Sequence, residues 1–372
     1  MPAISSTISS KGSSYLPSLD GWRAIAILWV LEGHSSLWKW GPLSNGWLIA
    51  TDSRGVALFF ALSGFLICTR LLSEEARTGA ISLKSFYTRR VFRIQPAAMT
   101  YLLVVVLLSA FGAIPRFWSG IAAAALMLRN IWPTALNPGY WYTAHFWSLA
   151  VEEHFYLLLP GFLVLFRRSR LAILLGTVAA LEIWQHIVFS TPRLQNGLSW
   201  QVAQRTDIAV SGILLGSAFA VALTHKSILR FAVSVVRPWV ALLYAVFVFV
   251  MAARHHSSLA QLPLITVYPL VILATVLHPE SAMTKLMELP PVRFLGRISY
   301  SLYLWQQLFS NGEGIPSPHS LYSHVILCWC CTFVCAIASY YLIEAPLIRR
   351  GHAIAKRFDL QPRLAGASEP AM

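Results

Sequence analysis

Long apolar runs separated by short polar and basic segments dominate the chain. A helix needs about 20 largely apolar residues to cross a bilayer, and runs near that length recur between residues 20 and 344. The pattern predicts an all-α fold, a polytopic membrane bundle of about ten transmembrane helices. The runs are residues 20–38, 54–72, 95–112, 146–166, 171–189, 207–224, 236–252, 262–278, 295–310 and 323–344. Pro346 follows the last run, and we expect this helix-breaking residue to end the last span.

The stretch 117–132 is a weaker apolar segment, because Arg129 and Asn130 interrupt it. With the N-terminus inside, ten spans without this stretch leave nearly every basic cluster in the cytoplasm. An eleventh span here would move Arg167–Arg170 outside, against the bias of cytoplasmic loops toward Lys and Arg. We therefore expect an outer loop over residues 113–145, with or without a re-entrant helix, and both termini in the cytoplasm.

Composition excludes a soluble protein. The chain is 56% hydrophobic and 12% charged, whereas soluble domains carry about 25% charged residues. The net charge of +14 would suggest nucleic acid in a soluble protein. Here the basic residues lie between apolar runs, which is typical of cytoplasmic loops. We therefore expect the lipid bilayer as a partner and no nucleic acid, in a multi-pass protein of the cell inner (plasma) membrane.

The two ends of the chain flank a single predicted membrane domain. Residues 1–16 are rich in Ser and lack the apolar core and cleavage site of a signal peptide, so we expect a disordered cytoplasmic N-terminus. Residues 17–350 form the membrane domain and residues 351–372 a cytoplasmic tail. Since 22 residues, 351–372, follow the predicted membrane domain, any chemistry is expected to be completed within that domain. The pattern predicts no metal site.

Two ionisable residues, Arg23 and His34, lie in the first apolar run. Ionisable groups inside spans are costly and often mark function. Eleven residues on a helix cover about 16 Å, which places Arg23 near the inner membrane surface and His34 farther along the span. His34 is suited to act as a general base because its ordinary pKa is near neutrality. A buried structural histidine explains it equally well at this point.

Arg90 and Arg93 form a second basic pair, predicted on the inner side just before the third span. Residues at i and i+3 of a helix face the same way, and two guanidinium groups on one face suit a phosphate or pyrophosphate. The alternative is that they only anchor the topology.

Acidic and aromatic groups mark three further spans. Glu152 and Glu153 head one span and need partners, for example a histidine, a hydroxylated acceptor or the helix N-terminus. Arg205 and Asp207 suggest an ion pair at an outer end. The run 295–305, Leu-Gly-Arg-Ile-Ser-Tyr-Ser-Leu-Tyr-Leu-Trp, is polar and aromatic enough to line a cavity.

Small residues mark helix contacts. Ser63 and Gly64 allow close helix packing, and Gly212 and Gly216 form a G-x-x-x-G face.

Together these segments resemble the acyltransferase 3 family of integral-membrane acyltransferases, over about residues 15–350. The family pattern has Arg, ten residues and His in the first span; Arg-x-x-Arg on the inner side; Trp-Ser-Leu-x-x-Glu before Phe-Tyr-Leu; a Gly-Arg-Ile-Ser-Tyr-Ser-Leu-Tyr-Leu-Trp run; and a closing Glu-x-Pro. These motifs are matched by Arg23 and His34, by Arg90 and Arg93, by Trp147–Glu152 with Phe155 and Tyr156, by residues 296–305, and by Glu344 and Pro346.

The resemblance implies transfer of an acyl group, usually acetyl, from cytoplasmic acyl-CoA to a hydroxyl of a sugar, often in an envelope glycan or exported glycolipid. Acetyl-CoA or another acyl-CoA is then a donor substrate, and no permanently bound cofactor is expected. Arg90 and Arg93 would hold the CoA phosphates. His34 would deprotonate the acceptor or carry the acyl group, with Arg23 placing the thioester or offsetting negative charge.

The remaining assignments concern the acceptor. Glu152 is expected to orient His34 or the acceptor. Substrate contacts are expected from Glu153, Arg205, Asp207, Tyr300 and Trp305.

The chain departs from the family pattern at three positions, with Ala24 for a glycine, Ala57 for an aspartate and Gln306 for a histidine. These changes bear on acceptor choice. The rival hypothesis is a transporter or flippase of a polar glycolipid, because intramembrane charges and glycine-rich spans fit that class too.

Overall fold

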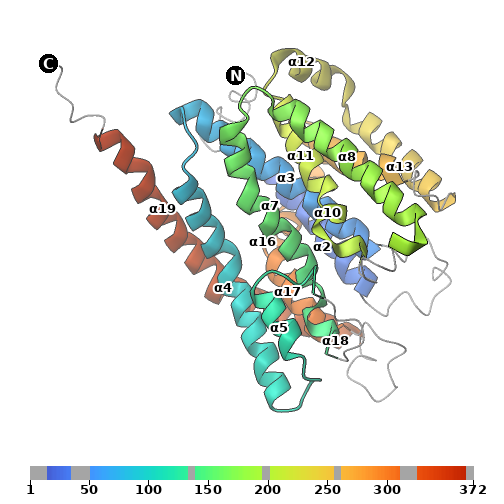
Figure 1. The fold of residues 1–372 in the computed structure, drawn as a ribbon, viewed down its shortest axis with the longest axis vertical. Helices are drawn as coiled ribbons and strands as arrows, with labels where there is room; N and C mark the ends of the chain where they lie inside the picture. Colours follow the sequence, from blue (N-terminus) through green and yellow to red (C-terminus); the bar gives the residue numbers. More distant parts are fainter. Residues whose placement is uncertain are drawn as a thin grey trace.

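Helices make up all the regular secondary structure in the part of the chain that the computed structural model describes. The described residues are 15–34, 51–132, 139–194, 202–254, 261–310 and 325–365. Figure 1 shows the helices gathered into one bundle, with α4 and α19 running side by side along one flank. The all-α membrane-bundle fold predicted from the sequence is confirmed.

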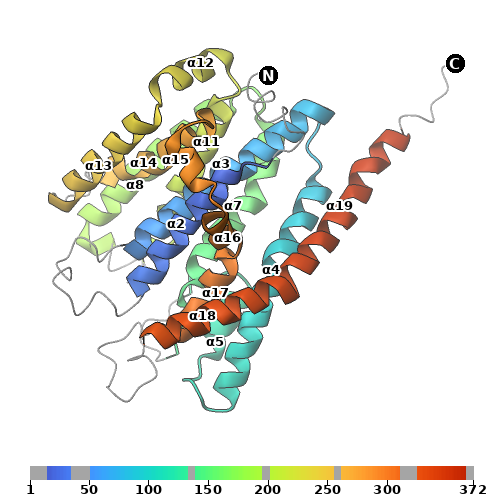
Figure 2. The ribbon, with the colours of Figure 1, turned by 180° about the vertical axis from the view of Figure 1, so that it is seen from behind.

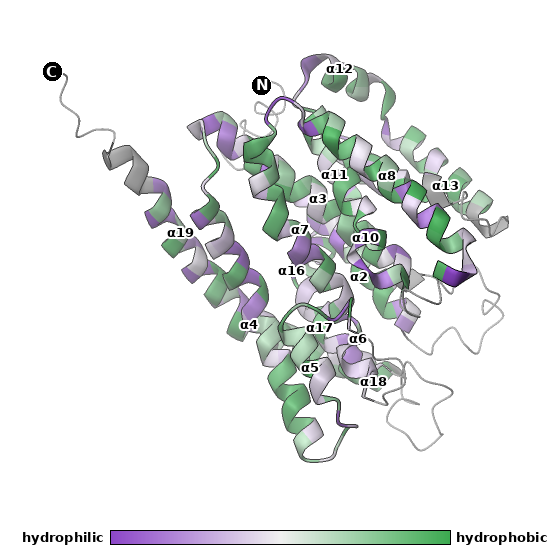
Figure 3. Cartoon of the chain, in the orientation of Figure 1, coloured by the Kyte–Doolittle hydropathy of each residue, from purple (hydrophilic) through white to green (hydrophobic). Residues whose placement is uncertain are grey.

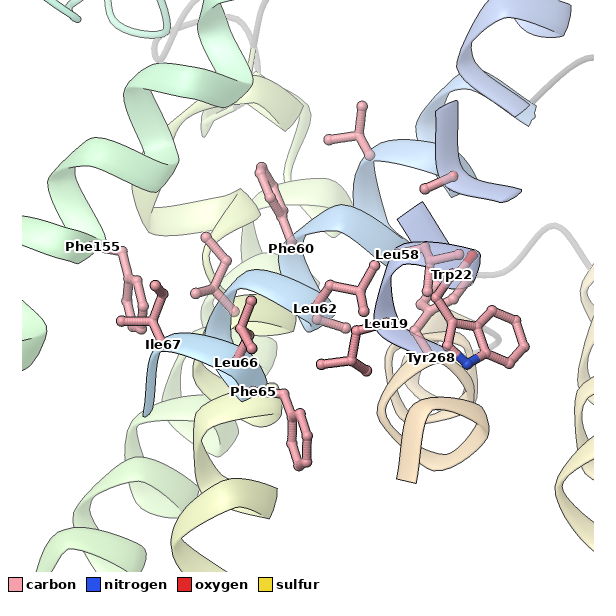
Figure 4. Packing of buried hydrophobic residues seen from close by; sticks show 14 of the residues in the cluster. Leu19, Trp22, Leu58, Phe60, Leu62, Phe65, Leu66, Ile67, Phe155 and Tyr268 are labelled. Atoms are coloured by element: carbon pink, nitrogen blue, oxygen red, sulfur yellow. The ribbon is translucent and has the colours of Figure 1, made fainter. Parts of the chain in front are cut away.

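Three helices form the centre of the bundle: α2 (Pro17–His34), α3 (Thr51–Thr78) and α11 (Ser211–Ala222). Their facing side chains are large and apolar. Figure 4 shows Leu58 and Leu62 of α3 grouped with Leu19 and Trp22 of α2, and all four are buried. This packing fixes α2, which carries both Arg23 and His34, against the interior of the bundle.

Two glycines bring α3 and α11 into backbone contact. A β-carbon at Gly64 would lie 1.9 Å from the carbonyl oxygen of Ile213, and one at Gly216 would lie 2.4 Å from that of Ala61. Any larger residue would push the helices apart. Gly212 has more room, with the nearest atom 3.7 Å from its β-carbon position. The predicted G-x-x-x-G contact is therefore made mainly by Gly216.

A second layer of helices surrounds this centre. Figure 2, the view from behind, shows α14 (Gln261–Leu277) and α15 (Ala282–Met287) against α2 and α3. Near the middle of the bundle, short helices connect the longer ones. The remaining elements are α5 (Trp118–Ala125), α6 (Trp141–Ala144), α7 (Phe146–Leu165), α8 (Arg170–Ser190), η2 (Val202–Gln204), α10 (Thr206–Ala209), α12 (Lys226–Val235), α13 (Pro238–Arg254), α14 (Gln261–Leu277), α15 (Ala282–Met287), α16 (Pro290–Arg297) and α17 (Ser299–Phe309).

Large apolar side chains cover the outside of several helices. Examples are Leu103 on α4, Leu158 on α7, and Leu243 and Phe247 on α13, each more than half exposed. A water-facing surface of this kind would drive aggregation, whereas lipid solvates it. Figure 3 shows the hydrophobic colour along the lower half of α4, while polar positions gather along α19 and the upper half of α4.

Five described helices are long and apolar enough to cross a membrane: Ser53–Thr78, Leu83–Ala110, Trp141–Leu165, Arg170–Ser190 and Ile326–Asp359. A sixth span results if the pair Ser211–Ala222 and Lys226–Val235, bent by 110°, is counted as one. Two shorter apolar helices are Pro238–Met251 and Pro263–Leu277. The count of ten spans and the cytoplasmic termini stay predictions, and residues 1–14 and 366–372 lie outside the described part.

The weak segment 117–132 contains only α5, which has eight residues. At 1.5 Å per residue it is about 12 Å long, well short of the ~30 Å hydrocarbon core. This helix therefore cannot cross the membrane alone, in agreement with the ten-span interpretation.

The third predicted span begins earlier than residue 95. α4 spans Leu83–Ala110, and the Ser82 side chain caps it by accepting a hydrogen bond from the Ser85 backbone N–H at 3.4 Å. Arg90 and Arg93 thus lie on the helix itself and not in a segment before it. The first turns of α4 are polar, so a search for apolar runs alone does not detect where this helix begins.

The last predicted span, 323–344, does not end at Pro346. α18 (Val325–Ser339) continues through a π-helix (Tyr340–Glu344) into α19 (Ala345–Ala365). Proline lacks the N–H that would bond to the preceding turn, and the wide π-turn lies directly before it. The proline is accommodated by this bulge, so the prediction that it breaks the helix was wrong.

Candidate active site

His34 is the last residue of α2, and its ring contacts α6 and α17. Its Nδ1 lies 3.0 Å from Oε1 of Gln306. Its ring also meets the Trp141 indole edge-on, with the ring centroids 5.4 Å apart. A histidine held from two sides in this way has a fixed ring orientation.

A chain of amide groups sets the tautomer of His34. The Gln307 side-chain NH₂ donates to the backbone carbonyl of Trp141 at 2.9 Å, and a carbonyl can only accept. The Oε1 of Gln307 therefore accepts from the Gln306 NH₂, also at 2.9 Å. That leaves Oε1 of Gln306 to accept from His34, so Nδ1 carries the proton and Nε2 is left with its lone pair. This is the form in which Nε2 can act as a base.

Arg23 lies eleven residues earlier on the same helix, about 16 Å away along the axis. Its Nη1 pairs with Oδ1 of Asp20 at 3.1 Å. Asp20 also accepts a short hydrogen bond from Tyr15. The sequence prediction that one helix carries both Arg23 and His34 is confirmed, and their depths in the membrane stay a prediction.

Arg90 belongs to a network centred on Glu152 of α7. Glu152 accepts from Ser63 at 2.8 Å and from the Tyr156 hydroxyl at 3.1 Å. Nη2 of Arg90 lies 3.9 Å from Oε2 of Glu152, and the guanidinium stacks 3.6 Å over the ring of Tyr156. Ser63 therefore does more than allow helix packing. The contacts of Glu152 in the described part are with Ser63, Tyr156 and Arg90, and its expected role toward His34 or the acceptor stays a prediction.

Positive charge accumulates beside this network. Arg93 interacts electrostatically with Arg23, Arg70 and Arg90, and with the single carboxylate of Glu344. Neither Arg93 nor the exposed Arg70 forms an ion pair with any residue the structure describes. Repulsion among these cations is unfavourable unless an anion joins them. An anion placed among these arginines would relieve this repulsion.

Aromatic and polar groups of α17 lie between the two ends. The Tyr300 hydroxyl donates to the Ile94 carbonyl at 2.8 Å, and Tyr300 lies within electrostatic range of Glu152, Glu153 and Arg90. Trp305 packs edge-on to Tyr101, but its buried Nε1–H has no partner. These contacts agree with the expectation that α17 lines the interior.

Unsatisfied polar atoms extend this site. One carboxylate oxygen of Glu153 is buried without a partner. Buried polar atoms in native proteins normally have a hydrogen-bond partner. The unpartnered oxygen of Glu153 is therefore a candidate contact for a ligand or a water molecule.

Arg205 and Asp207 form the predicted ion pair, with Nε 3.0 Å from Oδ1. Asp207 also accepts from the Trp184 indole of α8 at 3.0 Å. These contacts join α10 to α8, so the structure brings this pair together without linking it to His34.

Several residues of the site were not assigned from the sequence: Gln307, Trp141, Arg70, His145 and the buried Glu344, whose carboxylate accepts a short hydrogen bond from Ser301. Gln306 was noticed only as a departure from a family pattern. Its contact with His34 joins residues 272 positions apart, which no local spacing reveals. Among the described residues no cluster of His, Cys, Asp and Glu is arranged to hold a metal ion.

The fold is that of a multi-pass membrane protein. One end of α2 carries an oriented histidine, and around the other end lie arginines that outnumber their carboxylate partners. The sequence profile of the acyltransferase domain family, acyltransferase 3, matches residues 16–345. The chain belongs to this family.

Curated relatives agree with the family match. The chain is 29% identical over 370 residues to the peptidoglycan O-acetyltransferase OatA of Listeria monocytogenes, covering 91% of this chain and 56% of that protein. It is 28% identical over 374 residues to the O-acetyltransferase OatA of Staphylococcus aureus, covering 95% and 60%. The chain thus spans less than two thirds of the length of these relatives. No solved structure matches it.

Proposed function

We propose that this protein is an O-acyltransferase that moves an acyl group, acetyl in the first instance, from acyl-CoA to a hydroxyl of an envelope glycan or glycolipid. The observation that carries the proposal is the amide chain through Gln307 and Gln306, which leaves Nε2 of His34 as the base. The names of the relatives support a glycan acceptor, peptidoglycan among them.

The donor binds at the cationic end in this proposal. Arg90 and Arg93 hold the CoA phosphates by charge-assisted hydrogen bonds, and the pantetheine arm extends along α2 toward His34. This arrangement fits a donor that enters from the cytoplasm in an inner (plasma) membrane protein. The acceptor approaches His34 from the side of the outer loop.

The reaction follows from the protonation state of His34. Nε2 takes the proton of the acceptor hydroxyl as its oxygen attacks the thioester carbonyl. The new C–O bond forms, the C–S bond breaks, and the departing CoA thiolate receives the proton from the imidazolium. Transfer through an acyl-His34 intermediate satisfies the same balance in two steps.

The test uses the full chain in lipid nanodiscs with labelled acetyl-CoA and an envelope glycan fragment. We expect base-labile acetyl ester on the glycan and one CoA thiol released per ester formed. Replacing Arg90 and Arg93 together by Gln should weaken CoA binding at least tenfold, since charged hydrogen bonds contribute about 1.5–3 kcal/mol each. Arg230→Gln, on the exposed surface of α12, serves as the matched control.

Two outcomes contradict the proposal. One is a protein that binds no acyl-CoA. The other is movement of a glycolipid between leaflets without any release of CoA thiol, which is the behaviour of the transporter alternative.

A further inference from the structure

Arg129 follows α5 in the segment between the second and third long spans of the described chain. The turn that ends α5 has Met127 at φ 56°, the one non-glycine residue with positive φ in the described residues. The Leu128 N–H donates to the Ala123 carbonyl at 2.8 Å, as in a helix-ending motif that usually has glycine at this position. This strained turn directs Arg129 inward, where it is 0% exposed.

The guanidinium of Arg129 is only partly satisfied. Its Nε donates to the Thr143 hydroxyl at 3.2 Å, and its Cζ lies 4.5 Å from the ring centroid of Tyr140 and 5.7 Å from that of Phe117. Nη1 and Nη2 are buried and have no hydrogen-bond partner among the described residues. Among the described residues no carboxylate pairs with this cation.

Burying the Arg129 guanidinium without a counter-charge is unfavourable in free energy unless an anionic ligand pairs with it. Burial lowers the pKa of Arg129 to about 10, so the group is still charged at neutral pH. Stacking on aromatic faces recovers less than the cost of an unpaired buried charge. A guanidinium kept in this state within a folded protein indicates a site for an anion, because two adjacent end-on N–H groups match the two oxygens of a carboxylate or phosphate.

The Arg129 site lies near the His34 end of α2. Both Arg129 and His34 interact electrostatically with His145, which lies between α6 and α7. His145 is 3% exposed, and both of its ring nitrogens are buried without a partner in the part of the chain that the structure describes. The neighbouring Asn130 donates to Thr206 at 2.7 Å but has an unpartnered carbonyl oxygen. Unsatisfied polar groups thus continue from Arg129 toward the base.

We propose that Arg129 binds an oxyanion group of the acceptor, a carboxylate or a phosphate, and so presents a neighbouring hydroxyl of the same molecule to His34. This inference rests on the proposed acyltransferase function. It adds the acceptor class, which is an anionic rather than a neutral glycan. The site is separate from the CoA cluster, which lies near the other end of α2.

The experiment compares acceptors that share a sugar ring and differ in the group at C6, which is a carboxylate, a neutral amide or a phosphate ester. The probes are glucuronic acid, its neutral amide and glucose 6-phosphate, offered to the full chain in nanodiscs with acetyl-CoA. The wild type should acylate the acid or the phosphate with kcat/KM at least tenfold above the amide. Arg129→Gln should remove this preference, and Arg129→Lys should keep part of it. The exposed Arg116→Gln should change nothing. The relative rates of the acid and the phosphate identify the source of the oxyanion.

Two additional readouts keep the inference testable if turnover fails. The acid should raise the Tm of the wild type more than its amide does, and Arg129→Gln should abolish that difference whether or not acetyl is transferred. The rate of acetyl-CoA hydrolysis, in which water takes the place of the acceptor, measures whether the protein binds and uses the donor. If the protein neither hydrolyses acetyl-CoA nor transfers acetyl, but the acid still raises its Tm more than the amide does, the proposed acyltransferase function is refuted. The anion site at Arg129 is then still supported.

A structural role for Arg129 makes the opposite stability prediction. If Arg129 is kept for an acceptor, Arg129→Met removes an unpaired buried charge, and the Tm of the unliganded protein should stay the same or rise. A marked fall in Tm, or equal kcat/KM for acid and amide in the wild type, overturns the inference.

Discussion

The two ends of α2 lie in contrasting surroundings. Around Arg23 the environment is ionic, with cations that outnumber the carboxylates and side chains that retain some exposure. Around His34 it is aromatic and neutral, and orientation comes from amide hydrogen bonds between buried glutamines. The two ends belong to one helix, but charge–charge interactions dominate around Arg23, and amide hydrogen bonds and aromatic contacts dominate around His34.

This contrast indicates a division of work. Unpaired cations that keep some exposure attract a charged ligand and tolerate variation in its position, as CoA binding requires. A half-buried imidazole held by a hydrogen bond and an aromatic contact has one orientation and one tautomer, as proton transfer requires. The ionic end should control substrate affinity, and the aromatic end should control the chemical rate. Each prediction below changes one end and measures both quantities.

The largest effect is expected from His34→Ala. General-base catalysis contributes about 10²–10⁴-fold, so kcat should fall by that factor while the KM for acyl-CoA changes little. The measurement is thiol release by the purified enzyme, with membrane insertion and Tm checked in parallel. His225→Ala, at an exposed helix start, is the control. Full activity without His34 would refute its role as base.

A smaller effect is expected from Arg93→Gln at the ionic end. Losing a charged hydrogen bond to phosphate costs about 1.5–3 kcal/mol, so the KM for acyl-CoA should rise roughly 10–100-fold with kcat nearly unchanged. Arg89→Gln is the matched control, because Arg89 already pairs with Glu74 and Asp359 at 3.4 and 3.7 Å. If both variants raise the KM for acyl-CoA equally, Arg93 makes no specific contact with the phosphate and contributes only to the overall positive charge of this region.

Much of this contrast was predicted from the sequence. Helical periodicity alone placed Arg23 and His34 on one helix, and the i, i+3 spacing put Arg90 and Arg93 on one face. These are local properties, and the structure preserves them. The start of α4 was missed because its first turns are polar and depend on the Ser82 cap, which hydropathy does not detect.

The contacts between distant segments were not predictable in this way. Glu152 was expected to serve His34 or the acceptor, yet it contacts Ser63 and Arg90. Gln306 stands out only as an unusual residue at its position until the fold brings it to His34. Spacing determines which residues share a helix face, but not which faces meet.

Gln306→Ala tests the amide chain. Without Oε1 of Gln306 the His34 ring loses a fixed partner, and we expect kcat to fall about tenfold, which corresponds to one hydrogen bond of about 1–1.5 kcal/mol. The KM for acyl-CoA should not change. The pH profile of kcat should also shift, because the tautomer and basicity of His34 are no longer set by this contact.

Gln307→Ala provides the comparison for this variant, since it removes the next link of the chain. It should show the same direction with a smaller fall in kcat. A Gln306 variant with reduced stability but an unchanged pH profile would mean that the glutamine only packs the interior.

The smallest effect needs no variant. Raising the salt concentration from about 0.05 M to 0.5 M shortens the Debye length from ~14 Å to ~4 Å, which screens the partly exposed arginines but hardly reaches the buried amide chain. The KM for acyl-CoA should therefore rise a few-fold while kcat varies by less than about twofold. Arg93→Gln should show a weaker salt dependence of KM than the wild type, because one of the screened charges is already gone. If kcat responded to salt as strongly as KM, the two ends of α2 would share one electrostatic environment, and the division of work between them would have to be abandoned.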